Sequence, residues 1–134
     1  MSSTDLAALV LRLAVGSIFI VQGYRKTFAP AGAKGSGAAL RETIAAGGLP
    51  APALLAKTVA LVELIGGGLL VLGLATRIAA VPLGFTLLVA IVGFKWKEGF
   101  QGGWDWPLSV LASTVALGVL GAGALSIDHL IGLA

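Results

Sequence analysis

The chain has 134 residues, of which 57% are hydrophobic and 11% are charged, and its net charge is +3. A soluble domain is usually about 25% charged, and a domain of this size is mostly surface, so this composition excludes an ordinary soluble domain and indicates a protein that lies in a lipid bilayer. With no cysteine and one histidine, disulfides, thiolate chemistry and a multi-histidine metal site in one copy are excluded. We therefore expect no metal, and we expect the basic charge to serve anionic lipid headgroups rather than nucleic acid.

The first apolar segment covers residues 5–27, and about 20 such residues suffice to cross a bilayer. The opening letters MSSTD carry no basic residue, so we expect no cleaved signal peptide. One helical stripe follows the segment at steps of four, three, four and three, formed by Arg12, Gly16, Phe19, Gly23 and Lys26. A charged side chain within an apolar run costs roughly 2.5–3.5 kcal/mol at the centre of a spanning helix, so we expect Arg12 to lie inside a bundle.

The next segment is rich in Gly, Ala and Pro, and its middle reads SGAALRETIAAG. This pattern predicts a short helix at the membrane interface, bounded by Ser36 and Gly47. The second apolar segment, 52–74, contains the acidic residue Glu63, followed by Gly66 and Gly67. Glycines on a helix face let two backbones approach closely in a membrane, so we expect these two, with Gly16 and Gly23, to serve helix packing.

The third apolar segment, 77–96, follows after only about two residues, so the second and third helices are expected to be antiparallel neighbours. The fourth covers 106–121, with residue 125 as its latest end. The predicted fold is therefore all-α, an integral membrane antiparallel four-helix bundle with one short interfacial helix between the first two spans. Residues 1–134 are expected to form a single domain.

The basic residues near the ends of the spans predict the orientation of the chain. One side of the membrane receives only Arg77, whereas the other receives Arg25, Lys26, Lys34, Arg41, Lys57, Lys95 and Lys97. Loops on the cytoplasmic side carry the excess of Lys and Arg. We therefore expect the two larger loops in the cytoplasm and both termini outside.

Arg12 and Glu63 are the two ionisable residues well inside the apolar runs, on consecutive and hence antiparallel spans. Such residues normally face the bundle interior and pair, so an Arg12–Glu63 ion pair is predicted. Three interpretations stay open: a structural pair that locks two helices, a polar pocket that binds a ligand or moves a proton, or an Arg12 side chain that extends to the headgroups.

Gln22 and Lys26 lie at the inner end of the first span, and Lys95 at the inner end of the third. They are expected either to anchor and orient the chain or to form the cationic mouth of a pocket for an anionic substrate or a quinone head. The sequence shows no Ser–His–Asp set, no metal-ligand spacing and no dinucleotide fingerprint, so no catalytic residue can be named.

Four stretches together resemble the DoxX family of small bacterial membrane proteins. These are LRLAVGSIFIVQGYRKTF, GGLP, ELIGGGLLVLGLATR and GAGALSID, in this order along the chain. The resemblance implies a four-helix bundle in the bacterial cytoplasmic membrane and a redox context, with quinone as a candidate cofactor and an oxidoreductase as a candidate partner. Family members often carry His where this chain has Gln22 and Lys95, which argues against metal binding or proton relay by histidines here.

Three functions follow from these observations. The first is a membrane subunit that supports a redox system and shapes a quinone or small-molecule pocket around the buried pair, without being catalytic alone. The second is a small proton-coupled transporter in which Glu63 exchanges a proton for a cation, which a nearby arginine would oppose by keeping the carboxylate ionised. The third is a scaffold or assembly factor, for which the glycine faces would also serve contacts in a homo-oligomer.

Overall fold

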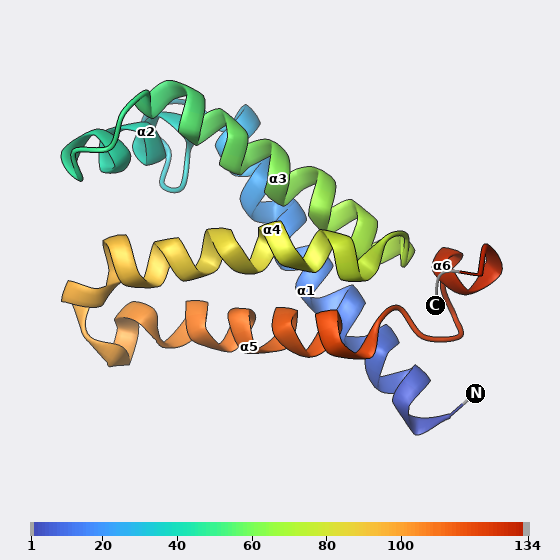
Figure 1. The fold of residues 1–134 in the computed structure, drawn as a ribbon. Coiled ribbons are helices and arrows are strands. Elements are labelled where there is room, and N and C mark those ends of the chain that lie inside the picture. The colour runs from blue at the N-terminus through green and yellow to red at the C-terminus, as the bar shows by residue number, and fades with distance from the viewer. Residues whose placement is uncertain (1, 133–134) are drawn as a thin grey trace.

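The computed structural model describes residues 2–132, and every element among them is helical. The four main helices are α1 (Ser3–Phe28), α3 (Pro52–Leu72), α4 (Thr76–Val89) and α5 (Asp105–Leu120). Helix α1 packs along α3, and α4 packs along α5, as Figure 1 shows. The predicted all-α membrane bundle is therefore confirmed.

The surface of the bundle is strongly apolar. Side chains that are more than 60% exposed include Leu54 on α3, Ile78, Val81 and Phe85 on α4, and Val119 on α5. Soluble monomers rarely leave such large contiguous apolar areas in contact with water. Lipid is the solvent that matches this surface.

Three helical runs are long and apolar enough to cross a membrane: Ser3–Phe28, Pro52–Leu72 and Thr76–Glu98. Helix α5 has 16 residues, or about 24 Å at 1.5 Å per residue, which is less than the hydrocarbon thickness of about 30 Å. The count of four crossings therefore stays a prediction.

The third predicted span, 77–96, is only partly a regular α-helix. Beyond Val89 the chain continues as a π-helical turn, η1 (Ala90–Lys95), then η2 (Trp96–Glu98) and η3 (Phe100–Trp104) before α5 begins. Gly99 and Gly102 have φ values of 79° and 78° in the connection, which glycine adopts without a steric penalty.

The short helix predicted between the first two long helices is present as α2 (Gly37–Ala46). The Ser36 hydroxyl accepts a hydrogen bond from the Ala39 N–H at 3.2 Å and so caps its first turn. Helix α2 packs against α3 and α1 and buries Ile44. It therefore covers one end of the α1–α3 pair, opposite the end where both chain termini lie (Figure 1).

The contact between α1 and α3 is a backbone-to-backbone seam that depends on glycine. A Cβ built at Gly67 would lie 2.8 Å from the Gly16 carbonyl oxygen, and one at Gly23 would lie 2.5 Å from the Leu64 nitrogen. Gly66 instead packs against the Leu83 side chain of α4. Around this seam lies a core cluster of Val15, Phe19, Leu70, Ala79, Leu83, Leu87, Val110 and Leu117.

Adjacent glycines on α3 provide a matched test of this seam. Gly67→Ala should destabilise the protein by about 1–3 kcal/mol, because its methyl group would overlap the α1 backbone. Gly68→Ala meets no atom within 4 Å and should be neutral or stabilising by up to about 1 kcal/mol. Unfolding of the purified protein in mixed detergent micelles, followed by circular dichroism, measures both; equal effects of the two substitutions would contradict the seam.

Candidate functional site

Arg12 is buried, with 2% of its surface exposed, and is held by backbone carbonyls rather than by an acid. Its Nε donates to the Leu70 carbonyl oxygen at 3.2 Å, and its Nη1 donates to those of Ala122 and Leu125, both at 2.8 Å. Carbonyl oxygens near the end of a helix carry partial negative charge. The guanidinium thus joins α1, the end of α3 and the closing segment of the chain.

Two carboxylates complete this end of the bundle. Asp128, in the short helix α6 (Ile127–Leu130), accepts from the Ala75 and Thr76 N–H groups at 2.6 and 3.0 Å and so caps the start of α4. Asp5 accepts from the Ala124 N–H at 3.0 Å. Arg12 therefore belongs to a structural closure of the bundle rather than to a cavity.

Glu63 is paired with Lys26, not with Arg12. The Lys26 Nζ lies 2.8 Å from both carboxylate oxygens, and the two side chains are 15% and 8% exposed. The predicted Arg12–Glu63 ion pair is therefore wrong, although both residues are buried.

The register of the two helices explains this difference. Gly16 lies against Gly67 and Val71, so Arg12 lies beyond the level of residue 71, more than about 12 Å along the axis from Glu63 at 1.5 Å per residue. Side chains lean toward the N-terminus of their own helix. The lean carries Arg12 further from Glu63 and carries Lys26 back toward it.

The Lys26–Glu63 pair lines a cavity of about 570 Å³ at the α2 end of the bundle. Its polar lining includes three residues expected from the sequence at a pocket mouth, Gln22, Lys26 and Lys95. The structure therefore brings these three together with Glu63, whereas Arg12 and the packing glycines lie elsewhere.

The other walls of the cavity are apolar or aromatic. They are formed mainly by Phe19 of α1, Leu40 of α2, Leu87 of α4, Phe94 of η1, and Trp106, Pro107 and Val110 of α5. Binding pockets for small molecules typically have volumes of about 300–1,000 Å³ and combine apolar walls with a few convergent polar groups. The cavity is within this range of volumes and combines apolar walls with convergent polar groups.

The entrance of the cavity has an excess of positive charge. Arg25 and Lys34 are exposed at its rim, and Lys95 lies 3.6 Å from Glu98, which is itself half exposed. Between residues 2 and 132, no group of three His, Asp or Glu side chains could hold a metal ion. The charged groups of this site are thus three ammonium groups, one guanidinium and two carboxylates, with the Gln22 amide and several hydroxyls as its uncharged polar groups.

Comparison with known proteins places the chain among its relatives. The DoxX family model matches residues 7–96. The chain belongs to the DoxX family. A Bacillus subtilis protein named "Putative oxidoreductase CatD" is 34% identical over 127 residues, which cover 94% of this chain and 87% of that protein. A Mycobacterium tuberculosis protein, "Uncharacterized membrane protein Rv3486", is 34% identical over 136 residues, which cover 92% of this chain and 80% of that protein.

No solved structure matches the chain. The DoxX match includes both partners of the buried pair, Lys26 and Glu63, and ends before the closing segment with Asp128. The two curated relatives extend over nearly the whole chain. Membership in DoxX supports a location in the membrane, as expected from the sequence.

Sequence reasoning missed three roles in this structure: Lys26 as the partner of Glu63, Asp128 as a helix cap, and backbone carbonyls as the partners of Arg12. The first had a signal, because Lys26 lies on the same stripe as Arg12 and leans toward the middle of the second span. Asp128 lies in the GAGALSID stretch that resembles the family, but that resemblance does not reveal its role as a cap. The carbonyl partners of Arg12 had no signal, because two of the three belong to residues 122–125, whose fold cannot be read from the sequence.

Two double-mutant cycles distinguish the observed pair from the one first expected. Lys26→Met alone should cost about 3 kcal/mol, near the lower end for a broken buried pair, because it leaves the Glu63 carboxylate buried without its partner. Adding Glu63→Leu should recover part of that loss.

The cycle of Arg12→Leu with Glu63→Leu should instead be additive within about 0.5 kcal/mol, because the two residues share no partner. Unfolding free energies in micelles measure both cycles. Strong coupling in the Arg12 cycle, with additivity in the Lys26 cycle, would contradict the Lys26–Glu63 pair and favour an Arg12–Glu63 pair.

Proposed function

We propose that this DoxX protein is a membrane subunit that supports a redox system by holding a quinone head, or a small molecule of similar chemistry, in the cavity around Lys26 and Glu63. The observation that carries the proposal is the cavity itself, in which an ion pair buried at the α2 end adjoins aromatic and aliphatic walls. A similar protein that is named as an oxidoreductase supports the redox context.

The residues present fit a quinone. A quinone ring has two carbonyl acceptors on an otherwise apolar plane, and the cavity offers donors from Gln22, Lys95 and Lys26 with Phe94 and Trp106 as flat walls. Aromatic side chains accept a ring in stacked or edge-to-face contact. Gln22 and Lys95 would hold the carbonyl oxygens, since Lys26 is engaged by Glu63.

A bound quinone would supply two-electron chemistry coupled to proton uptake. The chain's own contribution is to orient the ring, to exclude bulk water with the apolar walls, and to hold a proton donor and a carboxylate side by side. The Lys26 Nζ and the Glu63 carboxylate lie 2.8 Å apart, so a proton can be held between them with little motion. A buried pair of this kind is also less costly than either charge alone.

The electrons would have to come from a partner. The longest stretch between the main helices covers residues 29–51, and α2 occupies ten of these 23 residues, so the stretch is too short for a separate redox domain. The chain is therefore proposed to act with an oxidoreductase at the α2 end rather than to catalyse alone. A transporter fits less well, because Lys26 already neutralises the carboxylate that would exchange a cation.

Quinone binding should be visible through Trp106, which lines the cavity. Titration of the delipidated protein with a short-chain ubiquinone or menaquinone should quench tryptophan fluorescence to saturation. Lys95→Met and Gln22→Leu should each weaken the apparent affinity about five-fold, the equivalent of one hydrogen bond. Trp106→Phe should remove most of the saturable quenching.

Lys97→Met is the matched control, because Lys97 lies two residues from Lys95 and does not line the cavity. Its affinity should equal that of the unchanged protein. Quenching that never saturates, or that falls equally with Lys95→Met and Lys97→Met, would rule out the cavity as a quinone site.

We also propose that the chain crosses the membrane four times, with α5 as the fourth crossing, and that the α2 end lies in the cytoplasm. The basic residues of that end support the orientation, and both termini lie at the opposite end (Figure 1). A periplasm-active alkaline phosphatase fused after residue 132 should therefore be active. A fluorescent protein that matures only in the cytoplasm should stay dark at that position. Fluorescent cells would show that this end lies in the cytoplasm and would contradict the proposed topology.

A further inference from the structure

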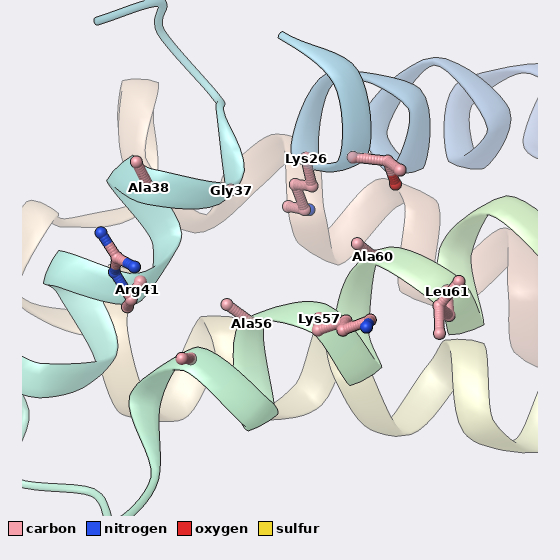
Figure 2. Close-up of a pocket in the computed structure, with 10 residues that line it drawn as sticks. Lys26, Gly37, Ala38, Arg41, Ala56, Lys57, Ala60 and Leu61 are labelled. Carbon is pink, nitrogen blue, oxygen red and sulfur yellow. The ribbon is translucent and has the colours of Figure 1, made fainter. Parts of the chain in front are cut away.

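A second hollow lies on the outside of the bundle, between the C-terminal end of α1, helix α2 and the first half of α3. Figure 2 shows it with Lys26 on α1, Arg41 on α2 and Lys57 on α3 among its walls. Its volume is about 320 Å³, and we call it the lateral groove. It is lined by Lys26, Thr27, Gly37, Ala38, Arg41, Ala53, Ala56, Lys57, Ala60 and Leu61.

The lateral groove carries positive charge without a matching acid. No Asp or Glu side chain lines it. Lys26 is neutralised by Glu63, whereas neither Arg41 nor Lys57 forms an ion pair with any residue that the structure describes. The groove therefore presents two uncompensated cations, from two different helices, to whatever occupies it.

Apart from Thr27, the rest of the groove is lined by glycine, alanine and leucine, and it continues onto the lipid-facing side of α3. Leu54, Lys57 and Leu61 recur at steps of three and four and so share one helix face. Leu54 and Leu61 are 64% and 42% exposed. Cationic groups near the α2 end thus adjoin an apolar strip that follows α3 toward the middle of the bundle.

We propose that the lateral groove binds the phosphate of an anionic lipid between Arg41 and Lys57, with the acyl chain along the Leu54–Leu61 face of α3. Arginine suits phosphate because its planar guanidinium donates two parallel hydrogen bonds, and lysine adds a compact point charge. Inorganic phosphate shares the headgroup chemistry, but only a lipid also uses the apolar strip. The groove shares Lys26 with the proposed quinone cavity, but Arg41 and Lys57 line only the groove, so the lipid site does not depend on quinone binding.

The test uses the full chain, delipidated in a mild non-ionic detergent, with three probes: dioleoylphosphatidylglycerol, dioleoylphosphatidylcholine and inorganic phosphate. Native mass spectrometry should show one phosphatidylglycerol retained per chain, and this lipid should raise the thermal unfolding midpoint more than phosphatidylcholine does. Arg41→Gln and Lys57→Gln should each weaken phosphatidylglycerol binding about five-fold, in line with the contribution of one basic residue near an anionic membrane surface.

Lys97→Gln is the matched control, because it removes one exposed charge from the same end of the bundle but outside the groove. It should leave phosphatidylglycerol binding unchanged. Equal losses with Lys57→Gln and Lys97→Gln would show that general surface charge holds the lipid and would overturn the proposal. Equal protection by inorganic phosphate would identify a free-anion site and would overturn the assignment to lipid.

A second variant keeps both charges and blocks the space. Ala53 is exposed in the groove wall, so Ala53→Trp can fill the groove without disturbing the buried core. It should reduce phosphatidylglycerol retention about as much as Lys57→Gln. Unchanged retention in Ala53→Trp would place the lipid elsewhere, even if the charge variants failed to fold.

Discussion

A charge buried in an apolar bundle must find partners within the protein, and this constraint organises both ends of the molecule. At one end the Arg12 guanidinium is satisfied by three backbone carbonyls, and the closing segment of the chain is folded around it. At the other end Lys26 and Glu63 satisfy each other inside a cavity. The first solution leaves the cation enclosed by the fold, whereas the second leaves two reactive groups beside an open space.

The glycine seam between α1 and α3 connects these two ends. Because Gly16, Gly23 and Gly67 allow backbone contact, the two helices are held in a fixed register, and the register decides which charges can meet. Along the seam the two helices pack closely. At the α2 end a cavity is present, and residues of α2 and of the π-helical turn η1 form part of its walls. The same end therefore gathers the cavity, the lateral groove and most of the basic residues.

Much of the fold could be predicted from the sequence, because hydropathy and helix signals are local. The apolar segments, the short helix begun by Ser36 and the packing role of the glycines all follow from residue type and spacing. The charge pairing could not be derived from span boundaries alone. Boundaries that are uncertain by a few residues at each end leave the axial register of the first two helices open. Only the glycine contacts set this register, and they place Arg12 more than about 12 Å along the axis from Glu63. The π-helical end of α4 has no sequence signal that distinguishes it from a regular helix.

The contacts of Arg12 have a consequence for biosynthesis. Its Nη1 acceptors, the Ala122 and Leu125 carbonyls, are 110 and 113 residues away in the sequence, and chains are made from the N-terminus onward. Helix α1 therefore exists throughout translation before its final acceptors have been made, and water or lipid phosphates at the bilayer surface must meanwhile solvate the guanidinium. The full set of Arg12 hydrogen bonds can therefore form only after residues 122–125 have been made, although the Leu70 carbonyl in α3 is available earlier.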